Sequence, residues 1–464
     1  MTLAKHPHAT PQLVAPARPK RPLSTVELFR VGLRNTLECC DEELFDELIV
    51  ERRYLWYRAF IISDPEGLRR VLADNQENYP RLDQNRRMFR FDSGSGLLSA
   101  DDETWNRHRR MINPALDHRA ALSDAPKLIP LAEALVASLA SWPANMDIDV
   151  CDFATVWMTL SAGHVFAGKD RSLDPMLQRM GVYPGRFSIL DFLPLPRWVH
   201  GIDKFRKSRV HPRTYYPVID RLIAERRNAD YAGEQDLMWK LAHARDRNTG
   251  EPFTLPELRD ETLTLGSTAA TPVRPLSWIW YLLAKHPWAE ERLHDELDRV
   301  LGDRTPTVED IGKLTFLRRL VDETMRLYPP LPSMFRVALA DDEVCGRKIP
   351  RNSIISVVPW IVHRHRKLWD EPDAFDPDRF SPEAVAARSR YAYLPFSIGP
   401  HVCIGASLSM MQILIGTAAL ARRFRVRLVP DFPIVPTAWT NLRPAHGIRA
   451  FLEPREPRRR VAAE

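Results

Sequence analysis

One cysteine near the C-terminus, Cys403, stands in a glycine-containing loop directly ahead of a long apolar stretch. Residues 406–424 have helical spacing, so the sulfur lies at the positive end of a helix, where an anion is favoured. Gly399 and Gly405 allow the loop to turn sharply beside a flat ligand, and Phe396 would shield the sulfur from water. This is the chemistry of a thiolate ligand to a haem iron.

Residues 396–405 read F-x-x-G-x-x-x-C-x-G, which resembles the haem-binding signature of the cytochrome P-450 family. For an isolated cysteine, a buried structural role is the alternative. The resemblance implies haem b as cofactor, Cys403 as the metal ligand, and Phe396, Gly399 and Gly405 as cofactor-binding residues. The likeness is to soluble bacterial members of the family.

Further motifs of that family precede the cysteine in the expected order. Glu323 and Arg326 lie three residues apart on a predicted helix, where they can pair, and Arg379 follows in F-D-P-D-R-F. Alone, such a pair is usually a weak surface ion pair. The resemblance to E-x-x-R and to the following meander implies a buried structural network of these three residues, which supports folding and haem retention.

Haem carries two propionates, which require fixed cationic donors, and arginine suits carboxylates through its planar fork. The family positions of such donors fall on Trp105 and Arg109, which match W-x-x-x-R, on Arg336 and on His401. Each of these alone would be read as a surface residue. Together they imply a set of propionate contacts.

The segment that would bind dioxygen, opposite the cysteine ligand in this family, departs from the family pattern. The motif A/G-G-x-D/E-T falls on residues 267–271, where Thr271 supplies the alcohol, Ala270 stands in place of the acid and Thr268 in place of the glycine. We expect Thr271 and Thr268 to be the catalytic residues. With Ser267, their hydroxyls would hold the proton-delivering waters in place of the missing carboxylate.

Two prolines, Pro272 and Pro275, follow inside the same predicted helix. Each removes a helical hydrogen bond, so the sequence predicts a kink beside Thr271 and free carbonyls at Thr268 and Thr271. Arg274 with Pro275 also resembles the Arg-Pro pair of fatty-acid peroxygenases in this family. A peroxide-driven or non-oxygenating enzyme (isomerase or dehydratase) and a non-catalytic haem sensor therefore remain as alternatives.

An apolar pocket is implied by aromatic and aliphatic residues at the family's contact regions, and it predicts a hydrophobic small-molecule substrate. Any of these residues could equally be core. The candidates are Phe89, Phe91, Leu97, Phe187, Phe192, Met334, Phe335 and Trp439. His363 and His365 offer too few convergent ligands for zinc.

The elements that must position these residues are mostly helical, which indicates a mainly α fold. By resemblance this is the cytochrome P-450 fold, with a large helical lobe and a smaller β-containing lobe. Apolar residues recur at helical spacing in 25–52, 105–116, 128–139, 215–226, 255–284, 288–301, 314–327 and 406–424. Strand-like segments fall at 55–62, 333–338, 353–358 and 424–428.

Composition is that of one globular domain. Hydrophobic residues make up 44% and charged residues 27% of the 464 residues, and no low-complexity linker divides them. We expect a basic, proline-rich flexible arm at 1–22 and a single catalytic domain at 23–464. Five cysteines without a regular framework favour a reducing compartment, hence the cytoplasm, and the sequence lacks a signal for a membrane anchor.

The formal net charge of +6 is spread along the chain without a nucleic-acid-binding motif, so we expect no nucleic-acid partner. No flavin-binding or ferredoxin cysteine pattern is present, which predicts electrons from a separate ferredoxin or flavodoxin and its reductase. A face with Arg107, Arg110, Arg422 and Arg423 would receive this acidic partner. The expected activity is insertion of one oxygen atom of dioxygen into the substrate.

Overall fold

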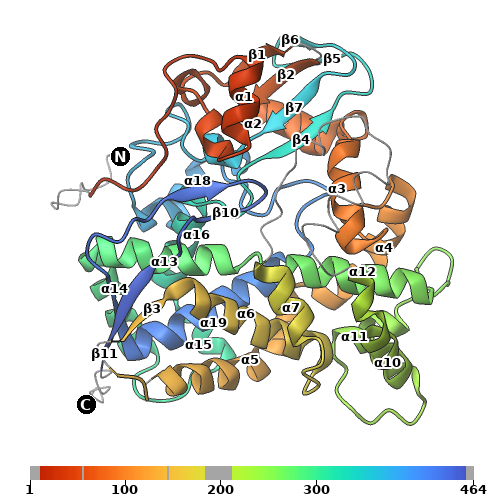
Figure 1. Cartoon of the computed structure of the whole chain (residues 1–464), viewed down its shortest axis with the longest axis vertical. Coiled ribbons are helices and arrows are strands. Elements are labelled where there is room, and N and C mark those ends of the chain that lie inside the picture. The colour runs from red at the N-terminus through yellow and green to blue at the C-terminus, as the bar shows by residue number, and fades with distance from the viewer. Residues whose placement is uncertain (1–10, 55–56, 140, 144–145, 183–211, 456–464) are drawn as a thin grey trace.

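The computed structural model describes residues 11–54, 57–139, 141–143, 146–182 and 212–455. Figure 1 shows a large helical lobe and, above it, a smaller lobe that contains the largest sheet. The helices of the large lobe are α4 (Asp102–Leu116), α5 (His118–Leu139), α6 (Val150–Ala167), α7 (Asp174–Val182), α10 (Tyr216–Arg227), α11 (Leu237–His243), α12 (Leu255–Thr268), α13 (Val273–Lys285), α14 (Pro287–Val300), α15 (Val308–Lys313), α16 (Thr315–Leu327) and α19 (Ala406–Arg423).

Four strands form the main sheet of the smaller lobe, in the order β1 (Ile49–Tyr54), β2 (Tyr57–Ile62), β7 (Ile354–Val357) and β4 (Met334–Val337). Pairing is antiparallel except between β2 and β7. The lobe also holds the hairpin β5 (Asp342–Val344) and β6 (Arg347–Ile349) and the helices α1 (Thr25–Gly32) and α2 (Pro65–Arg69), whereas α3 (Asp83–Ser93) packs against α12. Most of its apolar residues form a core cluster separate from that of the helical lobe, while Val50 of β1 and Ile61 of β2 join the latter.

The remaining elements flank the two lobes. A three-stranded sheet runs in the order β3 (Asp147–Asp149), β11 (Arg449–Pro454) and β8 (Phe424–Leu428), and β9 (Pro436–Ala438) pairs with β10 (Leu442–Pro444). Short helices α17 (Pro359–Val362) and α18 (Pro382–Ala387) lie in the chain between β7 and the Cys403 loop. The predicted mainly helical fold is therefore confirmed.

Most predicted helices agree with the structure to within a few residues, but the one expected at 25–52 is wrong. Only α1 is α-helical there, and two short 3₁₀ turns and β1 follow. Asn35 explains why the helix does not continue. Its side chain accepts from Leu37 N–H and Ala438 N–H and donates to Pro436 O. This buried amide ties the chain to the C-terminal region instead of continuing the helix.

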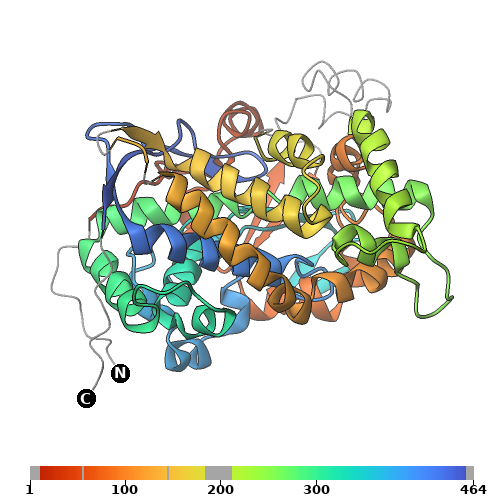
Figure 2. The same ribbon diagram turned by 90° about the horizontal axis from the view of Figure 1, so that it is seen from below.

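Helix α6 was not expected, because it is apolar on nearly all sides and lacks an amphipathic pattern. In the described part of the chain, it is the one helix long and apolar enough to cross a membrane. However, 61% of it is buried inside the fold, as in a core helix. In Figure 2, where the molecule is seen from below, α5 and α6 run across the helical lobe.

Of the flexible arm expected at 1–22, residues 11–18 contact the domain, whereas Lys20, Arg21 and Pro22 are exposed. Val14 N–H donates to the Tyr281 hydroxyl and Val14 O accepts from the Tyr328 hydroxyl, both at 3.0 Å. Arg18 pairs with Asp373 at 2.7 Å. Prolines hold this segment extended, and two buried tyrosine hydroxyls satisfy its main chain, so it lies as a strap across the molecule.

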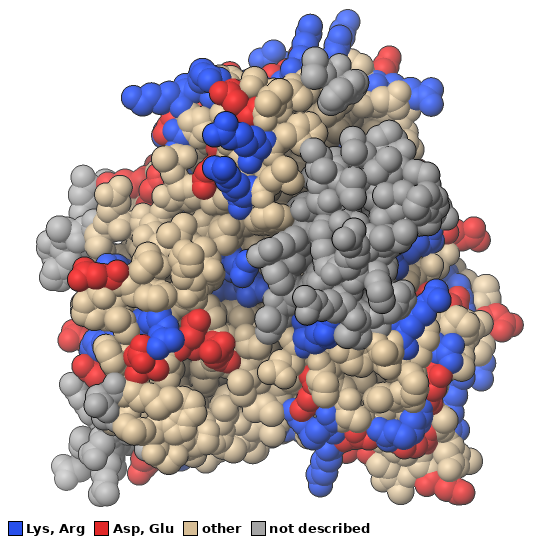
Figure 3. Space-filling model, in the orientation of Figure 1, with Lys and Arg blue, Asp and Glu red and all other residues tan. Residues whose placement is uncertain are grey.

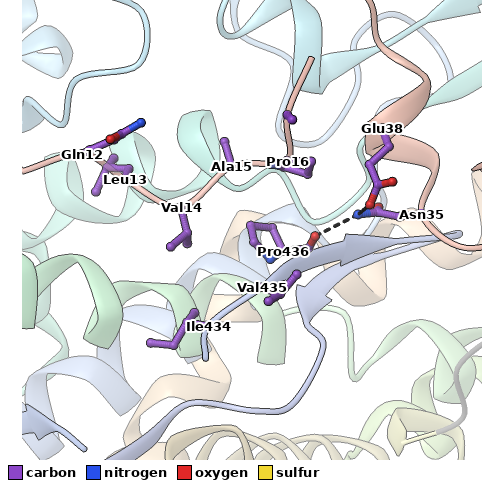
Figure 4. Close-up of a pocket in the computed structure, with 11 residues that line it drawn as sticks. Gln12, Leu13, Val14, Ala15, Pro16, Asn35, Glu38, Ile434, Val435 and Pro436 are labelled. Atoms are coloured by element: carbon purple, nitrogen blue, oxygen red, sulfur yellow. Dashed lines mark hydrogen bonds between the residues drawn. The ribbon is translucent and has the colours of Figure 1, made fainter. Parts of the chain in front are cut away.

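A pocket of about 570 Å³ lies between this strap and residues 434–436. Figure 4 shows Val14 and Pro16 along one side, Pro436 on the other, and the bond from Asn35 to Pro436 at its end. Its lining is mostly apolar. None of the residues expected to hold a cofactor lines this pocket.

Candidate functional site

The loop before α19 has a fixed backbone. Cys403 N–H donates to Phe396 O at 2.9 Å and Val402 N–H donates to Gly399 O at 3.0 Å. Gly399 has φ of +76°, and a Cβ there would lie 2.0 Å from the Leu72 carbonyl oxygen. Only glycine fits this turn, which holds the cysteine at the start of α19.

Cys403 is exposed at the start of α19, although protein atoms surround much of its thiol. The residue is accessible to solvent, yet the surrounding protein raises the pKa of its thiol by burial, against the opposing influence of Gly405 N–H and the Arg109 charge. Alone, the thiol keeps its proton. A bound metal ion removes that proton and satisfies the anion, so the accessible, partly desolvated sulfur fits a metal-centred group.

Cations converge beside this loop. The Trp105 and His401 rings lie 4.0 Å apart, and the Arg109 guanidinium lies over Trp105 at 5.9 Å. Burial, and then Arg81, Arg336 and Arg109, lower the pKa of His401 to about 3. The structure thus brings the four predicted propionate contacts to one place.

No carboxylate pairs with Arg109 or Arg336 among the residues that the structure describes. Burial lowers the pKa of Arg336 to about 10 and also lowers that of Arg109. Buried cations without counter-ions are costly. A dianionic group such as a haem with two propionates fits this cluster.

Two members of this cationic cluster were missed by the sequence analysis. Arg81 forms a β-bridge with Arg336 and donates to Leu97 O and Leu98 O at 3.1 and 3.2 Å. Arg86 of α3 also contributes to the low pKa of His401. Neither belongs to a motif. Their proximity depends on how the chain between β2 and α4 folds back over β4, which sequence spacing does not reveal.

The predicted Glu323 network is formed. Both side chains of the Glu323–Arg326 pair are fully buried, with two hydrogen bonds of 2.6 and 2.7 Å. Arg379 lies 3.7 Å from Glu323, and Asp376 N–H donates to Glu323 at 2.8 Å. Arg326 also donates to the His363, Pro372 and Ala374 carbonyls. One arginine thus ties α16 to the segment that leads to Cys403.

His363 and His365 do not form a metal site. His363 Nε2 accepts from Leu394 N–H at 2.8 Å, and His365 Nδ1 accepts from Lys367 N–H at 3.2 Å. Within the described ranges, no group of three or more potential ligands could hold a metal ion.

The predicted kink beside Thr271 is confirmed, because α12 ends at Thr268 and α13 begins at Val273. The expectation of free carbonyls is wrong. Thr268 O accepts from Thr271 N–H at 3.0 Å and Thr271 O accepts from Arg274 N–H at 3.1 Å. The chain tightens into 3₁₀-type turns. Pro275 then falls in the first turn of α13, where its missing N–H is not needed.

The hydroxyls around the break differ in their availability. Ser267 donates to Thr264 O at 2.8 Å, and Thr268 donates to Thr264 O and Leu265 O. The Thr271 side chain, which is half-buried, makes no hydrogen bond within the described residues. Thr271 is thus the hydroxyl free to bind a ligand or water. Arg274 lies near Arg443 and Cys151, and burial and Arg443 lower its pKa to about 10.

The expected pocket residues have mixed surroundings. Leu97 and Met334 are buried in the two cores, whereas Phe89, Phe335 and Trp439 are half-buried. Trp439 also donates to Arg34 O at 2.8 Å. The Phe91 side chain, Phe187 and Phe192 lie outside the described residues.

The expected cationic face for a redox partner is not formed. Arg107 pairs with Glu257 and Arg110 with Asp246. Arg422 is buried and pairs with Glu133, so Arg110 and Arg423 are the two exposed residues of the four, and Arg110 is neutralised by its carboxylate partner. The carboxylate partners of Arg107, Arg110 and Arg422 lie on other elements, which residue spacing does not reveal.

Comparisons with known proteins point to one family. The sequence profile described as cytochrome P-450 matches residues 35–445. Cyclooctatin synthase from Streptomyces melanosporofaciens is 30% identical over 78% of the chain and 79% of its own length. The cyclooctat-9-en-7-ol 5-monooxygenase of the same organism is 29% identical over 82% of the chain and 83% of its own length.

Another relative, the pentalenene oxygenase of Streptomyces avermitilis, is 30% identical over 54% of the chain and 56% of its own length. Among solved structures, the haem domain of cytochrome P450DA superposes with a TM-score of 0.79. It is 21% identical, and the match covers 96% of this chain and 99% of that one. This likeness concerns the fold alone.

Proposed function

The chain belongs to the cytochrome P-450 family and is a haem-dependent monooxygenase, and from this premise we propose that Cys403 ligates the iron and that the substrate is an apolar, ring-containing hydrocarbon skeleton. The observation that carries the ligand assignment is the accessible yet partly desolvated sulfur at the start of α19. Its loop is fixed by Gly399, so the sulfur is positioned before any ligand arrives.

When bound, haem b supplies the iron centre at which dioxygen is reduced and one oxygen atom is transferred to the substrate. Arg109, Arg336 and His401, with Trp105, hold the propionates through charge-assisted hydrogen bonds. The Glu323–Arg326–Arg379 network fixes the segment that carries Cys403. These residues bind and orient; they do not move protons.

At the break between α12 and α13, the Thr271 hydroxyl accepts a proton and passes it on to the reaction. Its main chain is held by the turns of the break, and its hydroxyl is not bonded back to the helix, unlike those of Ser267 and Thr268. Thr268 has a supporting part, because its hydroxyl satisfies carbonyls at the end of α12. Reduction of dioxygen consumes two electrons and two protons for each hydroxylated product and water.

The substrate class is supported by the names of two relatives, which refer to cyclooctat-9-en-7-ol and pentalenene. Both names denote largely hydrocarbon molecules. The half-buried Phe89 and Phe335 are suitable walls for such a molecule. A ring-containing hydrocarbon offers no charge, so shape and burial of apolar surface would select it.

Electrons come from a redox partner, for which we propose a ferredoxin or flavodoxin with its reductase, in the cytoplasm. The net charge of +6 favours an acidic protein. Figure 3 shows cationic and anionic side chains interspersed on the face it presents, without one continuous cationic surface outside the grey residues. On this face, docking by a few local contacts fits the charge pattern better than docking on a broad charged surface.

Turnover with a surrogate partner tests this proposal. The holoprotein would be incubated with ferredoxin, its reductase, NADPH and a panel of cyclic hydrocarbons, fatty acids and aromatic compounds. We expect dioxygen-dependent hydroxylation of cyclic hydrocarbons. Turnover with peroxide alone would favour the peroxygenase alternative motivated by Arg274, and spectral binding without product would favour a sensor.

A further inference from the structure

A buried pair of titratable groups, His108 of α4 and Glu261 of α12, has no part in the functions assigned above. His108 Nδ1 lies 2.6 Å from Glu261 Oε1, and the two residues are 1% and 0% exposed. His108 Nε2 faces Glu257 at 3.3 Å. Glu257 is half-buried and also pairs with Arg107 at 2.6 Å. A hydrogen-bonded chain therefore leads from the edge of the protein to a fully buried carboxylate.

This chain of groups continues along one face of α12. Glu257, Glu261, Thr264 and Thr268 recur at spacings of four, three and four residues, so they form one stripe on the helix. Thr264 is 2% exposed and stands about one helical turn, ~5 Å, from its neighbours in the stripe. A step of this length is one that a single water molecule can span. The stripe ends at the break that carries Thr271.

The segment 93–99 packs over this stripe of α12 and covers its polar side chains. Leu97 N–H donates to Glu261 Oε2 at 3.3 Å, and the Thr264 hydroxyl donates to Ser93 O at 3.3 Å. Gly96 lies so close that a Cβ there would be 2.0 Å from Thr264 Oγ1. A residue with a side chain would displace the segment, so glycine allows it to cover the polar stripe and exclude bulk water.

The carboxylates around His108 favour a proton held between His108 and Glu261. Burial alone lowers the pKa of His108, but the bonds to Glu261 and Glu257 more than reverse this and raise it. Burial raises the pKa of Glu261, against the effect of His108 and Leu97 N–H, while Asp260 acts in the same direction as burial. With Arg107 on α4 paired to Glu257, these are the charged groups that face the pair.

We propose that His108 and Glu261 form a proton relay that supplies the α12–α13 break and takes the place of the acid absent at Ala270. A proton enters at Glu257, moves to His108 and then to Glu261, and passes by Thr264 and intervening water to the hydroxyls at Thr268 and Thr271. Each transfer leaves the donor one proton short, and solvent restores it at Glu257. Two protons are delivered per turnover, while the redox partner supplies the two electrons.

This inference rests on the proposed monooxygenase function, and Glu261→Gln tests it in the holoenzyme. The amide retains the size of the side chain and can still accept from Leu97 N–H, but it cannot exchange a proton. We expect product formed per NADPH oxidised to fall roughly tenfold. Turnover driven by hydrogen peroxide should stay unchanged, because peroxide brings its own protons and electrons.

A matched control is the adjacent carboxylate on the same helix. Asp260 also holds segment 93–99, by accepting from Ser95 N–H at 2.7 Å, but it is not joined to His108. Asp260→Asn should leave the coupling of NADPH oxidation to product unchanged. A loss of coupling in both variants would mean that the two carboxylates only hold the segment, and this would overturn the relay.

A readout apart from activity uses ¹⁵N-labelled histidine in the holoprotein. We expect NMR to show both ring nitrogens of His108 protonated at neutral pH in the wild type, and a neutral ring in Glu261→Gln. A neutral His108 in the wild type, or unchanged coupling in the variant, would refute the proposal. If the wild type forms no product with the redox partner but the His108 signal is as expected, the monooxygenase assignment is wrong. The His108–Glu261 pair would then exist but would have no reaction to supply with protons.

Discussion

The segment that carries Cys403 and the break between α12 and α13 are held in different ways. Glu323 and Arg326 are fully buried and fully paired, and they tie three stretches of chain to each other. At the break, by contrast, hydroxyls bond to carbonyls of their own helix and backbone turns replace a side-chain network. One region thus depends on side-chain identity, and the other on backbone shape that several sequences can produce.

Replacing Glu323 gives the largest expected effect of this difference. Glu323→Gln removes one charge of a buried pair and leaves Arg326 without its counter-ion, which should lower the free energy of unfolding by about 3–5 kcal/mol. Urea denaturation of the holoprotein measures this. The matched control is Glu66→Gln, because Glu66 pairs with Arg69 at the same spacing at 2.9 Å, with side chains 65% and 49% exposed.

The Glu66→Gln control should lower the free energy of unfolding by less than about 1 kcal/mol. Equal losses in the two variants would mean that burial of the Glu323 pair is not what stabilises the Cys403 segment.

The second prediction separates cofactor binding from folding in the same region. Arg336→Leu removes a buried cation that has no carboxylate partner among the described residues, so the apoprotein should be at least as stable as wild type. Haem should bind roughly 10–100-fold more weakly, because a charge-assisted hydrogen bond is lost. Haem transfer to apomyoglobin measures retention, and Arg336→Lys should restore part of it. Unchanged haem transfer in Arg336→Leu would remove Arg336 from the propionate contacts.

The smallest effect is expected at the break. Thr271→Val replaces the hydroxyl with a methyl group and should lower the yield of product per NADPH about fivefold, the value of one hydrogen bond. Stability should not change. Thr262→Val is the control, since the Thr262 hydroxyl on the other side of α12 donates to Leu258 O. A similar loss in the control would assign the effect to packing of the helix.

The same difference explains what could be predicted from the sequence. The Glu323 network and the cations near Cys403 are carried by residue types at fixed spacing, so motifs were sufficient to find them. The pairing of Thr268 O with Thr271 N–H could not be foreseen, because removal of one helical bond does not specify which turn replaces it. Arg81, and the partners of Arg107 and Arg110, depend on contacts between distant segments.

The order of the strap could not be foreseen from the sequence. Residues 11–18 have no periodic pattern, and a proline-rich basic composition is typical of a solvated arm. Their order comes from the Tyr281 and Tyr328 hydroxyls, nearly 270 and more than 310 residues away in the chain. Only the fold brings those partners together.

A bond from Cys403 to iron is the central assignment for this protein, and the absorption spectrum of the reduced holoprotein under carbon monoxide tests it. We predict the red-shifted Soret band of thiolate-ligated haem in the wild type and in Cys345→Ala, whose cysteine is exposed in the β5–β6 hairpin. The band should be absent in Cys403→Ala. A wild-type protein without this band, or a Cys403→Ala protein that retains it, would contradict the assignment.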